Sequence, residues 1–136
     1  MEIAIGIIGL IIAILTFYYS FFRKPKEELD NLKIQFKPTQ QLSKKLQVEL
    51  ENYINATDSW NHPMFPNISF GAYLTEMKES YKENLSDDLY KKLDTLNLTK
   101  PIIRSRTKSL ETQFNALQQL QIELRIRSRK VLHNES

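Results

Sequence analysis

The chain has 136 residues, which is enough for one ordinary domain and a membrane anchor. It carries 19 Lys and Arg against 16 Asp and Glu, and the resulting net charge of +3 argues against a bulk nucleic-acid binder. Because the chain contains no cysteine, disulfides and thiolate metal sites are excluded. Three glycines and five prolines leave few breakers among many helix-forming residues, so we predict an all-α fold.

The first predicted element is a single N-terminal transmembrane helix. Residues 3–22 read IAIGIIGLIIAILTFYYSFF without a charge, and a helix of this length spans roughly 30 Å, the thickness of the hydrocarbon core. Basic residues follow the run, and bulky aromatics stand where a signal peptidase needs small side chains, so we expect an uncleaved anchor with a cytoplasmic domain behind it. The predicted residues of the inner membrane interface are Tyr18, Tyr19, Phe21, Phe22, Arg23, Lys24 and Lys26.

Small residues recur at heptad spacing along one stripe of the predicted span. They are Gly6, Gly9, Ala13, Thr16 and Ser20. Small side chains let helix backbones approach closely, and hydroxyls can hydrogen-bond across the contact. The stripe therefore predicts self-association or pairing with another membrane helix. Chance is the alternative, because small residues are common in membrane helices.

We divide the chain into a membrane anchor (1–22), a basic juxtamembrane connector (23–37) and a cytosolic helical domain (38–136). Residues 27–36 of the connector fit either a short helix or an extended segment. The first clear helix is expected after Pro38, with Thr39 as its N-cap and an end near Thr57. Its predicted apolar face consists of Leu42, Leu46, Leu50, Tyr53 and Ile54.

Residues 58–71 form the long irregular stretch of the domain, because Pro63, Pro66 and Gly71 break regular structure there. Aromatic and other contact-forming residues gather in it, namely Trp60, His62, Met64, Phe65 and Phe70. Two interpretations stay open. These side chains either pin the connection onto the helices or form a recognition loop for a base, a peptide or a partner protein.

Three further helices are predicted. One covers roughly 72–84 with Tyr73, Leu74, Met77 and Tyr81 inward. A second is capped by Ser86 with acidic residues in its first turn, and the last opens near residues 99–101 and runs to about Leu132. The last helix carries a seven-residue apolar repeat made of Ile103, Leu110, Leu117, Leu124 and Val131. Because the intervening seam positions are mostly polar, this is half a coiled-coil seam. It fits a helix packed across its own bundle or an oligomeric coiled coil.

Charge is polarised along the domain. Residues 100–136 hold eight Lys and Arg against three Asp and Glu, whereas residues 38–99 hold six against nine. Four cations, Lys100, Arg104, Arg106 and Lys108, stand at the start of the last helix, where the helix dipole disfavours them. They are a candidate site for an anion such as a nucleotide, although solvated surface or pairing with an acidic neighbouring subunit explains them too.

No sequence pattern of a catalytic or metal site is found, and the two histidines have no second ligand at metal spacing. We therefore expect a non-enzyme without a cofactor: a small cytosolic helical bundle on one membrane anchor, with a long, partly heptad-patterned last helix. The leading hypothesis is a self-associating interaction module that forms a homo-oligomer or joins another membrane subunit. One alternative is an oligomeric membrane effector gated by an anionic ligand, as in bacterial defence systems. A membrane-tethered nucleic-acid binder is the other.

Overall fold

The computed structural model describes residues 11–14 and 26–135. It is 81% helical, which confirms the predicted all-α class. Its elements after residue 25 are α2 (Lys26–Thr57), β1 (Pro63–Phe65), β2 (Ile68–Ser69), α3 (Phe70–Asn84), α4 (Asp87–Lys92) and α5 (Lys100–Glu135).

Most of the predicted membrane span lies outside the described residues, which include only residues 11–14 of it, in a short helical segment. Within residues 11–14 and 26–135, no helix combines the length and the apolar character that crossing a bilayer requires. The span, and the interface residues before Lys26, therefore stay predictions.

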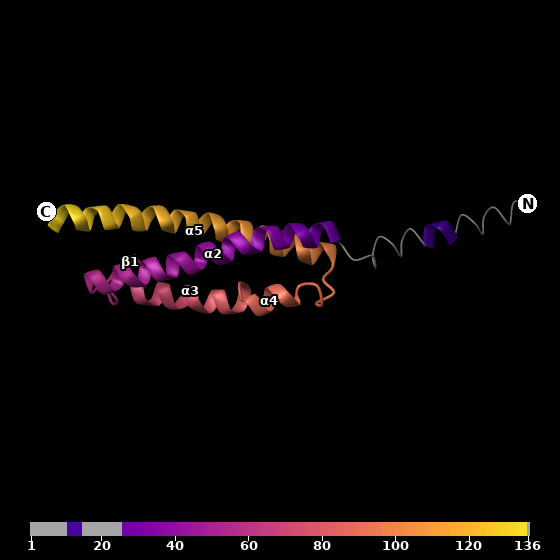
Figure 1. The fold of residues 1–136 in the computed structure, drawn as a ribbon, viewed down its shortest axis with the longest axis horizontal. Helices are drawn as coiled ribbons and strands as arrows, with labels where there is room; N and C mark the ends of the chain where they lie inside the picture. Colours follow the sequence, from indigo (N-terminus) through magenta and orange to yellow (C-terminus); the bar gives the residue numbers. More distant parts are fainter. Residues whose placement is uncertain (1–10, 15–25, 136) are drawn as a thin grey trace, which may run out of the picture.

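Helix α2 lies between its two partners, with α5 along one side and α3 along the other (Figure 1). The chain runs away from Lys26 along α2, returns along α3 and α4, and runs away from that end again along α5 (Figure 1). Helices α2 and α5 are therefore parallel. Contacts at both ends agree with this direction, because Glu28 lies 3.8 Å from Arg104, and Ile54 shares a hydrophobic cluster with Leu124.

Helix α2 begins at Lys26 and continues through Pro38, so the predicted helix start with Thr39 as N-cap is wrong. Thr39 is buried in the helix interior, and its Oγ1 donates to the Gln35 carbonyl at 2.8 Å. Pro38 has no N–H, which removes the usual bond to the Ile34 carbonyl. Pro38 and Ile34 are both exposed, so water can solvate that carbonyl and the proline is tolerated.

The helix continues across the proline because both halves of α2 present apolar residues to the same core. One cluster lies toward the N-terminal end of α2 and consists of Leu32, Phe36, Leu85, Leu93, Ile103 and Leu110. The other lies toward its C-terminal end and consists of Leu46, Leu50, Ile54, Met64, Phe70, Leu74, Leu120 and Leu124. The buried polar side chains of Thr39, Gln40 and Ser43 lie on α2 between the residues that it gives to each cluster.

Residues 58–71, expected to be irregular, contain a two-stranded antiparallel hairpin. Asp58 ends α2 in the left-handed conformation, with φ of 50°, which acidic and amide residues adopt more readily than most. Strands β1 and β2 pair Pro63 with Ser69 and Phe65 with Ile68. The hairpin is too short for the alternating apolar pattern by which longer strands are recognised in a sequence.

The remaining helix predictions are confirmed in their main features. Helix α3 starts at Phe70 because the Ser69 hydroxyl caps it by accepting from the Ala72 N–H at 3.1 Å. Ser86 caps α4 in the same way, through the Leu89 N–H. Helix α5 starts at Lys100, as the sequence indicates.

The packing predicts that alanine substitutions at two positions of α2, two residues apart, change the free energy of unfolding by very different amounts. Leu46 is fully buried, so Leu46→Ala should lower the free energy of unfolding by about 2–5 kcal/mol. Val48 is 58% exposed, so Val48→Ala should change it by less than about 0.5 kcal/mol. Urea denaturation of the full chain in detergent, followed by circular dichroism, measures both. Equal losses would contradict this core assignment.

Candidate functional site

Three of the four cations predicted as an anion site lie along one face of α5, beside the first turn of α2. Lys100 Nζ and Arg104 Nη2 lie 3.7 and 3.8 Å from the same Glu28 carboxylate oxygen. Arg104 and Lys108 also line an open hollow together with Glu27, Glu28 and Glu111. The carboxylates of the same chain therefore balance these cations, and no excess of positive charge is left in this hollow.

Arg106 is not part of that group. It lines a small separate cavity of about 60 Å³ with residues that include Leu32, Phe36 and Leu110. The four predicted cations therefore do not converge on one point. Sequence spacing alone could not reveal the carboxylate that pairs with Lys100 and Arg104, because Glu28 is distant in the chain.

The predicted recognition loop divides into buried and exposed members. Met64 and Phe70 are both 3% exposed and belong to the core, and the Phe70 ring stacks on Tyr53 with centroids 5.4 Å apart. These two residues hold the hairpin on the helices, as the first of the two interpretations expects. They are not available to a partner.

The other aromatic members reach the surface. Trp60 is 49% exposed, and its ring lies so close to Gly71 that a Cβ there would collide with the indole. Phe65 is 41% exposed, and its ring centroid lies 5.8 Å from that of Tyr73 on α3. His62 is exposed as well. The hairpin therefore presents aromatic surface from a rigidly packed base.

Arg127 fixes the hairpin to α5. Its Nη2 donates to the Met64 carbonyl at 2.9 Å, its Nε donates to Glu123 at 2.8 Å, and its guanidinium lies 5.4 Å from the Phe70 ring centroid. The sequence offered no signal for this role, since Arg127 stands among other cations near a helix end.

The seven-residue repeat of α5 faces the core of its own chain over most of its length. Ile103, Leu110 and Leu124 are buried in the two clusters, and Leu117 packs against one of them. These contacts account for the repeat without a second copy. Val131, the last member, is half-buried and lines a groove.

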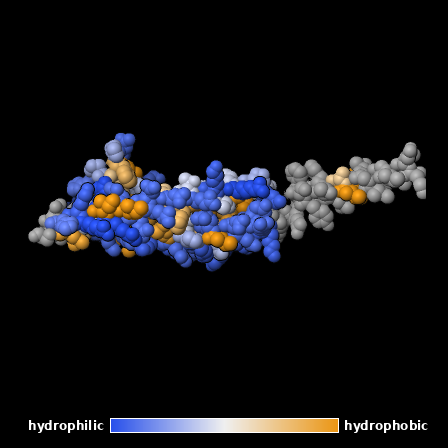
Figure 2. Space-filling model, turned by 90° about the horizontal axis from the view of Figure 1, so that it is seen from above, coloured by the Kyte–Doolittle hydropathy of each residue, from blue (hydrophilic) through white to orange (hydrophobic). Residues whose placement is uncertain are grey.

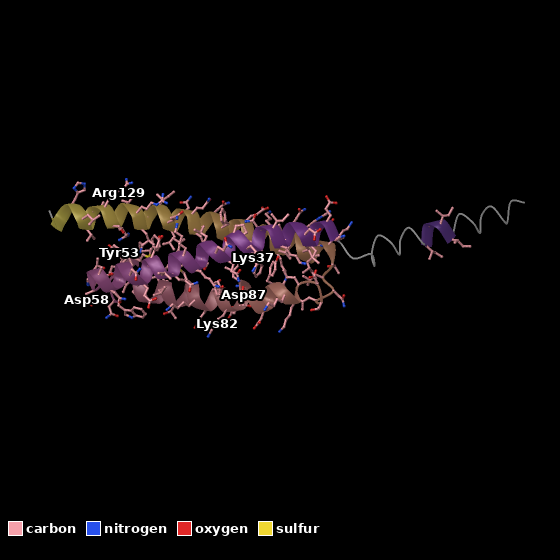
Figure 3. The ribbon with its side chains drawn as sticks, viewed as in Figure 1. Lys37, Tyr53, Asp58, Lys82, Asp87 and Arg129 are labelled. Carbon is pink, nitrogen blue, oxygen red and sulfur yellow. The ribbon has the colours of Figure 1, made fainter. Side chains whose placement is uncertain are left out.

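This groove lies between the C-terminal ends of α2 and α5 and has a volume of about 660 Å³. Figure 3 labels Tyr53 of α2 and Arg129 of α5 at this end of the molecule. Its described lining comes from α2 and α5 alone: Glu49, Asn52, Tyr53, Ala56, Thr57, Leu124, Arg125, Ser128, Arg129, Val131 and Leu132. Figure 2 shows apolar surface near the C-terminal end of α5, bordered by hydrophilic surface.

The groove combines an apolar interior with a positive edge. Leu132 is 67% exposed although it is a large apolar residue. Arg125 and Arg129 are exposed, and among the described residues neither forms an ion pair. Glu49, the carboxylate in the lining, lies 3.9 Å from Lys45. Such a groove fits an apolar or aromatic group with a carboxylate beside it.

A second polar cluster joins α2 to the α3–α4 junction. Gln40 is 3% exposed, and its Nε2 donates to the Leu85 carbonyl at 2.9 Å and to Asp87 Oδ1 at 2.7 Å. The hydrogen bond from Gln40, helped by Lys44 and Lys37, holds the pKa of Asp87 below its ordinary value of 3.8. Lys37 and Asp87 are labelled in Figure 3. This cluster is structural, because its polar groups satisfy one another.

No family model, curated protein or solved structure matches this chain. Among residues 11–14 and 26–135 there is also no group of three potential metal ligands. The groove between α2 and α5 is the feature of the described residues that best fits a binding site. Sequence reasoning found its Val131 and Leu124 as seam residues but did not find the groove itself.

The low pKa of Asp87 predicts a pH effect on stability. The folded state favours the carboxylate, so Asp87 stabilises the protein above its ordinary pKa of 3.8, and this contribution is lost as the pH falls through the folded pKa. Asp87→Asn should therefore weaken the fold at pH 7, and the difference from the native chain should shrink as the pH falls below 3.8. Chemical denaturation across this range measures the difference. Asp88→Asn is the control, and it should change the pH dependence less.

The hairpin contact predicts a difference between two arginines of α5. Arg127→Met leaves the Met64 carbonyl without its donor and should cost about 1–3 kcal/mol of unfolding free energy. Arg125→Met removes a cation with no ion pair among the described residues and should change stability by less than about 0.5 kcal/mol. Thermal and urea denaturation provide the comparison. A stability loss at Arg125 that equals the loss at Arg127 would contradict the assignment.

Proposed function

We propose that this protein is a single-pass, membrane-anchored interaction module that self-associates and holds its helical domain at the cytoplasmic face. The observation that carries the proposal is the uncharged run of residues 3–22, followed directly by basic residues. Helix α2 begins at Lys26, so little chain separates the predicted span from the domain. A connection this short would keep the start of α2 close to the membrane.

The shape of the domain determines where an anchored copy would present its groove. Helix α5 has 36 residues, which corresponds to a length of about 54 Å. Because α2 and α5 are parallel, the groove lies at the end of the domain away from Lys26 (Figure 1). An anchored domain of this kind would present its binding surface tens of ångströms from the lipid.

The predicted span supplies the means of self-association. The stripe of Gly6, Gly9, Ala13, Thr16 and Ser20 would let two or more spans pack closely, in place of lipid contacts. Identical anchored copies would then hold their domains side by side in the same orientation. The function we propose is therefore assembly and partner recognition.

The stripe is tested by enlarging its small residues. Gly9→Leu combined with Ala13→Leu should shift the full chain in detergent from an oligomer toward the monomer, because bulky side chains keep the backbones apart. Light scattering with chromatography reports the mass. The control variant carries Ile7→Leu and Ile11→Leu on the opposite helix face and should leave the mass unchanged. A native chain that is monomeric in detergent and in bilayers would disprove self-association.

A further inference from the structure

We propose that the groove between α2 and α5 of one copy receives the exposed hairpin of a neighbouring copy. The inference rests on the self-association proposed above, and it names the surfaces that meet. The inserted surface consists of the exposed ring of Phe65 with Glu76 of α3 near it, and the receiving surface is the groove with Arg125 and Arg129 at its edge.

The hairpin and the groove lie at the same level of the molecule. Arg127 holds the hairpin through the Met64 carbonyl, and the groove is lined by residues of α5 on either side of Arg127 in sequence. Copies that share one orientation in a membrane have their hairpins and grooves at the same distance from the bilayer. The hairpin of one copy can therefore dock into the groove of the next without either copy moving along the membrane normal.

The two surfaces lie on different sides of α5. Arg125 faces the groove and Arg127 faces the hairpin, and residues two apart project about 200° apart around a helix. A hairpin therefore does not reach the groove of its own chain. A surface on one side that fits a surface on the other produces a head-to-tail contact, which closes into a ring when the rotation between copies allows.

The surfaces also match in chemistry. Phe65 exposes an aromatic ring, and Tyr53, Leu124 and Val131 give the groove an apolar interior.

Glu76 follows Tyr73 by one helical turn and lines a hollow with it, and the Tyr73 ring packs on Phe65, so Tyr73 alone separates the Glu76 carboxylate from the Phe65 ring. Glu76 forms no ion pair among the described residues, and the same holds for Arg125 and Arg129. Each of these charges is without an ion-pair partner within residues 11–14 and 26–135, and docking would give it one of opposite sign in the neighbouring copy.

The absence of cysteine makes a direct test simple. Asn67→Cys at the hairpin tip and Ser128→Cys in the groove are placed in two full-length copies with different tags, which are reconstituted together in bilayers. Mild oxidation should join the two tags through a disulfide. Lys130→Cys replaces Ser128→Cys as the control, because it lies at the same level of α5 but outside the groove lining.

We expect the groove pair to form roughly tenfold more mixed-tag dimer than the control pair, since only one of the two thiols faces the docked hairpin. Equal yields from both pairs would overturn the proposal. A product dominated by the Ser128→Cys copy joined to itself would also overturn it, because that product indicates a symmetric contact between grooves. Circular dichroism of each variant verifies that the fold is retained.

The charge pairing is tested in the same assay. Arg125→Glu in the groove copy and Glu76→Lys in the hairpin copy should each lower the mixed-tag yield by roughly tenfold, because each places like charges together. The two changes combined should restore most of the yield. Additive losses would show that these residues do not face each other.

The outcomes separate this inference from the proposed function. If light scattering finds only monomers, self-association itself fails. If the chain is oligomeric but the groove pair is not enriched, the copies associate through other surfaces and only the hairpin-in-groove contact is wrong. An acidic helix of a different protein as the occupant would belong to this second case.

Discussion

The structure depends on a single constraint, which is that α2 buries apolar residues against two partners at once. It contacts α5 on one side and α3 on the other, whereas α3 and α5 have few close backbone contacts with each other in the described chain. The chain covers the two sides of α2 by reversing direction after α2 and again after α4. Helices α2 and α5 are consequently parallel, and their positive N-terminal ends meet. Glu28 lies where these ends meet. Its negative charge offsets the positive charge of both helix N-termini and of the nearby Lys100 and Arg104.

Buried polar groups give this simple packing a defined register. Apolar helix faces tolerate sliding, because neighbouring arrangements bury similar areas. Gln40 restricts that freedom, since its amide donates to the Leu85 carbonyl and to Asp87 at the junction of α3 and α4. A shifted arrangement would leave this amide buried without partners, which is costly. Among the described side chains, no buried polar atom lacks a hydrogen-bond partner.

Local signals in the sequence predicted local structure well, and contacts between distant segments escaped them. Ser86 with its following acidic residues marked the start of α4, and apolar spacing predicted which face of α5 is buried. The predicted start of α2 was wrong because of Pro38. The hydrogen bond that a proline removes from a helix can be read from the local sequence, whereas the burial of apolar residues on both sides of Pro38 depends on distant segments. The groove and the role of Arg127 depend on segments that only the fold brings together. The sequence likewise did not show that Glu28 lies beside Lys100 and Arg104 of the predicted anion site.

The parallel arrangement of α2 and α5 also determines how the domain would carry a mechanical load. A pull between the start of α2 and the far end of α5 acts along both helix axes, so it loads their shared interface in shear. All the contacts along the interface then resist together, including the buried side chains of Leu32, Leu46, Ile103 and Leu124. An antiparallel pair pulled from adjacent ends would open one contact at a time. A pull along both helix axes would therefore not separate α2 from α5 one contact at a time.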